Sequence, residues 1–126
     1  NCHYHINVMI AHAENQPVTF QHRAVREEDI LTAHRDATTF FFDHCTSTAW
    51  DVIGRALASR PQLQTLALFH CNAGDALYKY LSTSKSLLRL RVGTDFLNPV
   101  HCGTTEEGVR KIVEIKQLEE LVIGRP

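Results

Sequence analysis

The chain has 126 residues, which is enough for one domain, and its apolar fraction of 44% is ordinary for a globular protein. Its formal net charge of −1 provides no overall basic field. We therefore expect neither a nucleic acid nor an anionic membrane surface as partner. No apolar run approaches the roughly 18 residues of a membrane-spanning helix, so no membrane segment is predicted.

The N-terminal third follows a strand-and-helix pattern only loosely. A helix is predicted near residues 26–34, and an alternating strand is predicted upstream of it, in His5-x-x-Val8-x-Ile10-x-x-Ala13. We interpret residues 1–35 as an irregular N-terminal repeat or cap, and residues 36–126 as the regular part of the chain.

From residue 36 onward, one apolar strand pattern occurs four times. Its copies are Ala37-x-x-Phe40-x-Phe42-x-x-Cys45, Leu63-x-x-Leu66-x-Leu68-x-x-Cys71, Leu87-x-x-Leu90-x-Val92 and Leu118-x-x-Leu121-x-Ile123. Their first positions are 26, 24 and 31 residues apart. The alternation is typical of strands with one buried face.

An amphipathic helix is predicted after each of the first three strands. Apolar residues at spacings of three and four should face the sheet: Ile53, Ala56 and Leu57, then Leu77, Tyr80 and Leu81, then Val109, Ile112 and Val113. Six residues separate each helix from the next strand, as between Leu57 and Leu63. This constant connection favours a stack of equivalent units.

The segment Leu63-Gln-Thr-Leu66-Ala-Leu68-Phe-His-Cys71 resembles the L-x-x-L-x-L-x-x-(N/C) signature of leucine-rich repeats, in the ribonuclease-inhibitor-like or cysteine-containing subclass. The resemblance implies an α/β leucine-rich-repeat solenoid, a right-handed βα superhelix of about four to five units. The parallel sheet would form its concave face and the helices its convex face. Gly93-Thr94-Asp95 departs from the signature, since it lacks the Asn or Cys. An ordinary α/β fold with helix-connected parallel strands is the alternative.

The two ends favour a piece of a longer chain. The sequence begins without methionine, and its last predicted strand has no helix after it. We therefore expect a fragment whose last repeat is incomplete.

Cys45 and Cys71 occupy equivalent positions in successive repeats. The resemblance implies a buried ladder there, in which small thiols help to satisfy backbone groups of the loops. A disulfide or a metal pair is the alternative, while Cys2 and Cys102 show no spacing partner. We expect free thiols in a reducing compartment, and hence an intracellular, cytoplasmic location.

The segment Cys2-His3-Tyr4-His5, with His12 nearby, contains ligand types that suit zinc or copper. No second ligand pair follows at metal-site spacing, so we predict no metal site and no cofactor. His101 and Cys102 are adjacent rather than convergent, which argues against a nucleophile–base pair. We do not expect an enzyme.

The outward-facing residues of the strands are the better candidates for function. Aromatic and arginine side chains are enriched at binding hot spots. The predicted partner-binding residues are Phe41, Asp43, Phe69, Arg89, Arg91 and Glu120 on the sheet, with Phe96 in the 93–104 loop. We predict a non-catalytic scaffold that binds a protein partner through this surface. The alternative is a structural repeat segment, covered by the rest of a larger protein or complex.

Overall fold

Strands and helices alternate throughout the computed structural model, which describes residues 17–93 and 104–124. The five strands are β1 (Val18–Gln21), β2 (Thr39–Asp43), β3 (Thr65–Phe69), β4 (Arg89–Gly93) and β5 (Glu120–Gly124). The four helices are α2 (Glu27–Leu31), α3 (Trp50–Ala58), α4 (Gly74–Leu81) and α5 (Glu106–Ile112). The four predicted strands from residue 36 onward are therefore confirmed.

The strands form one parallel sheet in the order β1-β2-β3-β4-β5, so that each strand pairs with its neighbours in the sequence. The register joins equivalent positions of the repeated pattern. One such row across the sheet consists of Phe20, Phe42, Leu68, Val92 and Ile123. The predicted α/β class is confirmed by this alternation around a parallel sheet.

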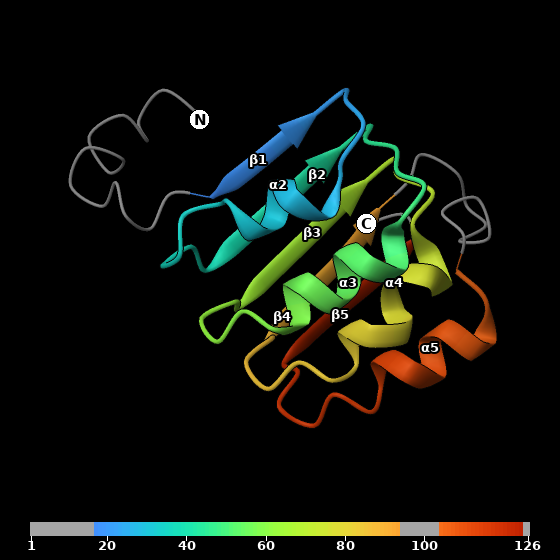
Figure 1. Cartoon of the computed structure of the whole chain (residues 1–126). Coiled ribbons are helices and arrows are strands. Elements are labelled where there is room, and N and C mark those ends of the chain that lie inside the picture. Colours follow the sequence, from blue (N-terminus) through green and yellow to red (C-terminus); the bar gives the residue numbers. More distant parts are fainter. Residues whose placement is uncertain (1–16, 94–103, 125–126) are drawn as a thin grey trace, which may run out of the picture.

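The described helices all lie on the same side of the sheet (Figure 1). Phe40 and Phe42 of β2 are completely buried on that side, as are Leu66 and Leu90 of the next two strands. They share one core with the inward residues of the helices: Ile53, Ala56, Leu57, Leu77, Leu81 and Ile112. Trp50 begins α3 and packs edge-on against Phe42, with 5.9 Å between ring centroids. Alternation in the strands and three-and-four spacing in the helices thus converge on one core.

Helices α3 and α4 approach each other closely at Gly54. A Cβ atom there would collide with the backbone carbonyl of Leu77. Backbone atoms cannot be displaced as a flexible side chain can, so this approach requires glycine.

Side chains also join successive helix-to-strand turns. Ser86 donates to the carbonyls of Arg60 (3.2 Å) and Leu63 (2.6 Å), and Gln117 donates to those of Ser84 (3.1 Å) and Leu87 (3.2 Å). Ser86 and Gln117 both immediately precede the first apolar position of their unit. Each side chain therefore satisfies carbonyl groups of the turn before it, which fixes the spacing between units.

The earliest joint uses an arginine instead. The guanidinium of Arg60 donates to the carbonyl of Ile30 at 2.9 Å and to that of His34. It also lies over the ring of Phe40, 4.9 Å from the centroid. The same class of turn carbonyl is thus satisfied, but by a residue from the turn itself.

The predicted position of the N-terminal strand was wrong. The strand that pairs with β2 is β1, in which Val18 lies beside Phe40 and Phe20 beside Phe42, whereas residues 5–13 lie outside the described part. The register brings the first apolar position of the pattern onto Asn15, a polar residue, and this hid the unit. The helix predicted near residues 26–34 is confirmed as the shorter α2.

Two predicted core positions on the helices are also wrong. Tyr78 rather than Tyr80 is completely buried in α4, where its hydroxyl lies 3.0 Å from that of Thr104. Val113 follows the end of α5 and is 63% exposed. In both cases the helix faces the core over fewer turns than the apolar pattern covers.

Candidate functional site

The predicted partner-binding residues of the sheet lie on the face opposite the core. Thr39, Phe41 and Asp43 of β2 alternate with the buried phenylalanines, and the parallel register carries the same orientation into the later strands. We call this surface the open face. Its other residues with described side chains in β3 to β5 are Thr65, Ala67, Phe69, Arg89, Arg91, Glu120 and Val122. Phe96 and loop residues 94–103 lie outside the described part.

Two aromatic residues meet in the middle of the open face. The rings of Phe41 and Phe69 are tilted at 57°, with centroids 5.3 Å apart. Both residues are only partly buried. The ring of Phe69 extends over Gly93, where a Cβ atom would collide with it. Glycine at position 93 therefore lets the ring lie close to β4.

Two arginines border this aromatic pair, and they differ in how firmly they are held. Arg91 forms an ion pair with Glu120, with 3.3 Å between Nε and Oε1. Arg89 donates to the hydroxyl of Thr65 at 3.3 Å and is 4.0 Å from a carboxylate oxygen of Glu119. About half of each arginine side chain is exposed, so these pairs contribute little stability.

A shallow hollow of about 220 Å³ lies between the aromatic pair and β5. Its lining consists of Phe69, Arg91, Val92, Gly93 and Val122. The walls are mostly apolar, and one arginine stands at the side. Such a hollow matches a single inserted side chain better than a whole small molecule, since ligand pockets are usually larger and more enclosed.

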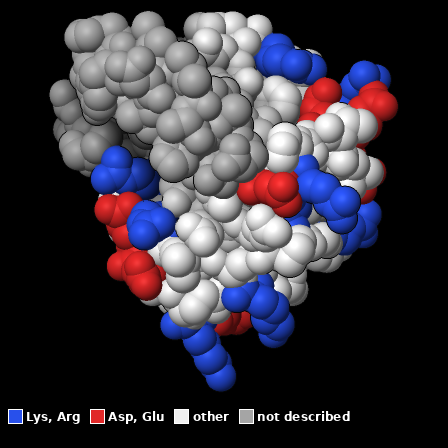
Figure 2. Space-filling model, turned by 90° about the vertical axis from the view of Figure 1, so that its left-hand side faces the viewer, with Lys and Arg blue, Asp and Glu red and all other residues white. Residues whose placement is uncertain are grey.

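Figure 2 shows the charges on another view of the molecule. On its coloured part, Lys and Arg side chains are interspersed with Asp and Glu around uncharged surface, and neither sign gathers into a continuous patch. Recognition on such a surface depends on shape and local pairs rather than on a long-range field.

Three histidines occupy the carboxyl ends of the first three strands, an arrangement that the sequence analysis missed. His22, His44 and His70 each follow the last residue of a strand, and each has a left-handed backbone, with φ of 53°, 54° and 58°. Their N–H groups donate to the carbonyls of the next strand's last residue: Asp43, Phe69 and Gly93. We call these three residues the histidine ladder.

The imidazole rings of the ladder are stacked. The His22 and His44 centroids are 4.7 Å apart at an interplanar angle of 13°, and those of His44 and His70 are 4.4 Å apart at 26°. Asp43 adds a carboxylate, whose Oδ1 lies 2.8 Å from Nδ1 of His44. Nitrogen and oxygen ligand types are thus concentrated at one edge of the sheet. The signal in the sequence is the spacing of these histidines, 22 and 26 residues, which matches the repeat interval.

The cysteines form a ladder on the inner side of the same loops. Both Cys45 and Cys71 are buried free thiols. The Cys45 thiol donates to the carbonyl of Phe20 at 3.2 Å, and the Cys45 N–H lies 3.4 Å from Sγ of Cys71. Burial raises the pKa of the Cys71 thiol to about 11. These contacts agree with thiols that satisfy loop backbone groups, and they exclude a disulfide between the pair in this structure.

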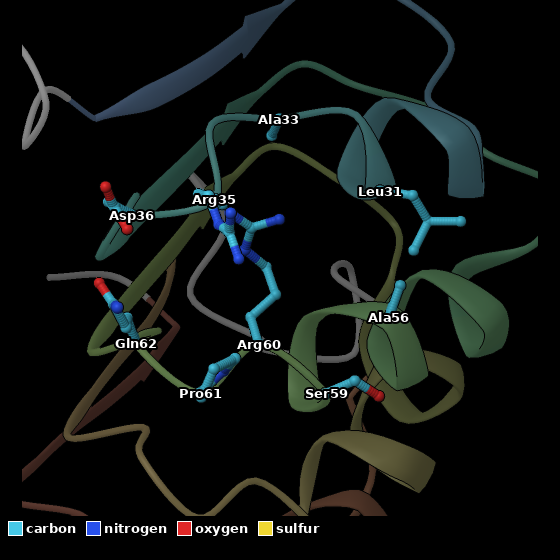
Figure 3. A pocket seen from close by; sticks show the side chains of 9 residues that line it. All are labelled: Leu31, Ala33, Arg35, Asp36, Ala56, Ser59, Arg60, Pro61 and Gln62. Carbon is cyan, nitrogen blue, oxygen red and sulfur yellow. The ribbon is translucent and has the colours of Figure 1, made fainter.

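A second hollow, of about 300 Å³, lies at the opposite edge, between the turns that follow α2 and α3 (Figure 3). Arg60 extends into it from below, between Arg35 and Pro61 (Figure 3). Its guanidinium is already used on the backbone carbonyls of Ile30 and His34, and burial lowers the pKa of Arg60. We therefore interpret this hollow as a joint between units rather than as a ligand site.

The comparisons with known proteins come next to this geometry. No family model, curated protein or solved structure matches this chain. Among the described residues, no helix is long and apolar enough to cross a membrane. The candidate surfaces are therefore judged on their own residues: the open face, with its aromatic pair and hollow, and the histidine ladder at its edge.

Proposed function

We propose that the chain is a segment of a leucine-rich-repeat solenoid that binds a protein partner through the open face, without catalysis. The observation that carries this proposal is the Phe41–Phe69 pair beside the apolar hollow. Large aromatic groups on a rigid sheet lose little conformational entropy on binding, which makes them suitable anchors.

The lining of the hollow indicates what the partner presents. Phe69, Val92 and Val122 favour an aliphatic or aromatic side chain. Arg89 is held only by a hydroxyl and a distant carboxylate, so a carboxylate of the partner can pair with it. We therefore propose a partner segment in which an apolar residue inserts next to an acidic one.

The test compares matched variants in affinity capture from a cell extract. Phe69→Ser changes the open face, whereas Leu31→Ser changes an equally apolar residue, 62% exposed, on the helix side. We expect a protein that is retained by the parent and by Leu31→Ser but lost with Phe69→Ser. Identical captured proteins for all three chains, at equal melting temperatures, would contradict the proposal.

The arginines give a second arm of the same experiment. Replacing both Arg89 and Arg91 with alanine should weaken retention of that protein without lowering the melting temperature, because both side chains are half exposed. Retention at the parental level would remove the arginines from the binding surface.

A specific observation favours a second candidate, a repeat segment that continues into further repeats. Leu121 and Ile123 of β5 are only partly buried, whereas their register partners Leu90 and Val92 are completely buried. A further unit stacked on β5 would cover them, as terminal layers of solenoids need. This candidate predicts that the isolated chain associates in solution. A monodisperse chain with a cooperative melting transition would contradict it.

A further inference from the structure

The histidine ladder carries an inference that is independent of the proposed partner. We propose that His22, Asp43 and His44 bind one divalent transition-metal ion of the class that prefers imidazole ligands, with zinc as its representative. One potential ligand atom from each of the three residues lies within 4.8 Å of the others. Two imidazoles and a carboxylate form a ligand set that zinc uses in proteins.

Only a small movement is needed to close this site. Zinc–nitrogen and zinc–oxygen bonds are about 2.0–2.2 Å long, so two ligand atoms on one ion are at most about 4.2 Å apart. The present limit of 4.8 Å therefore has to contract by less than about 1 Å. His22 is exposed and the His44 side chain is 48% exposed, so both rings can turn about their side-chain torsions.

The backbone supplies an independent argument that the imidazoles matter. A left-handed conformation is reached most easily by glycine or asparagine, and other residues pay a cost there. The fold needs this conformation at all three positions, because each N–H bonds to the next strand. Histidine nonetheless fills all three, and the side chains stack in line. The rigid strand ends thus hold the ligands in place before an ion arrives.

Asp43 has a defined place in this arrangement. Its contact of 2.8 Å with Nδ1 of His44 leaves Nε2 of that ring for the ion. A carboxylate that orients a ligand histidine is a common feature of zinc sites, and its loss usually lowers affinity by about 10- to 100-fold. His70 stacks on the far side of His44, and we place it outside the site.

The first test locates the ion residue by residue. Long-range proton–nitrogen NMR spectra of the full chain, recorded during zinc titration, should show the ring nitrogens of His22 and His44 shifting together and saturating at one equivalent. This readout needs no substitution and separates the ladder from the N-terminal Cys2-His3-Tyr4-His5 segment. Zinc uptake that leaves both rings unshifted would overturn the proposal.

The second test measures affinity by calorimetry with zinc chloride, with Cys2→Ser, His3→Asn and His5→Asn present in every chain to remove the N-terminal ligands. His22→Asn and His44→Asn should each lower the affinity by at least about tenfold, because asparagine keeps the left-handed backbone but replaces the imidazole. The matched control is His70→Asn, the same substitution at the equivalent position of the next repeat. It should leave the affinity within about twofold.

Two results of this comparison would overturn the assignment: parental affinity in His22→Asn and His44→Asn, or a loss in His70→Asn as large as theirs. If an asparagine variant fails to fold, as judged by its melting curve in chelator, the NMR titration of the parent chain decides.

Discussion

The guanidinium of Arg60 lies over the ring of Phe40, with its central carbon 4.9 Å from the centroid, while its nitrogens donate to backbone carbonyls of the preceding turn. This one side chain therefore joins the turn after α3 to the turn after α2. The contact combines cation–π attraction with charge-assisted hydrogen bonds.

The first prediction concerns this joint. Arg60→Ala should lower the free energy of unfolding by about 2–3 kcal/mol, because the carbonyls of Ile30 and His34 lose a charged donor. Urea denaturation gives the value directly. Arg35→Ala removes an exposed arginine from the same hollow and serves as the control, with an expected change within about 0.5 kcal/mol. Equal losses would show that Arg60 has no special part in the joint.

The second prediction concerns the contact between α3 and α4. Alanine normally stabilises a helix interior relative to glycine by about 1 kcal/mol. At Gly54 the sign should reverse, with a loss of about 1–3 kcal/mol, because the new methyl group meets the Leu77 carbonyl. Thermal and urea unfolding of Gly54→Ala measure this. A stabilised variant would mean that the two helices are farther apart than described.

The third prediction concerns Gly93 on the open face. Gly93→Ala should displace the Phe69 ring, and the aromatic protons of Phe69 and Phe41 should shift in NMR spectra, because a methyl group occupies the place of the ring. The ring is partly exposed and can turn away, so the free energy of unfolding should change by less than about 1 kcal/mol. Unchanged aromatic shifts would contradict the contact between this ring and β4.

The fourth prediction concerns pH. Burial raises the pKa of Cys71 from an ordinary value of 9.0 to about 11, so the folded state holds the thiol proton more tightly than the unfolded state. Its contribution to stability is complete below pH 9 and is lost as pH rises towards 11, by up to about 1.4 kcal/mol per pH unit. Urea unfolding at pH 8 to 11 should show a steeper fall for the parent than for Cys71→Ala. Parallel curves would contradict the raised pKa.

Much of this architecture was predictable because the pattern repeats. Alternation at Phe40 and Phe42, copied at Leu66 and Leu68, fixes which face of the sheet is buried. The same alternation placed Phe41 and Phe69 on the opposite face, where the structure has them. Periodicity of two leaves only one choice of side once the core is known.

The failures have equally local causes. The first strand was missed because Asn15 stands where the pattern calls for an apolar residue, and without that strand His22 had no place in a register. The ladder depends on the φ angle of single residues after each strand, which apolar periodicity does not encode. Tyr78 was missed because its partner, Thr104, is remote in the sequence.

The strand order has a consequence for how the chain folds. Every strand pairs with the strand that precedes or follows it along the chain, across intervals of one unit. Loop closure is therefore equally short at each step, and no pairing has to wait for a distant segment. A chain emerging from the ribosome can add one strand and one helix at a time to an existing edge, with each completed unit serving as the template for the next.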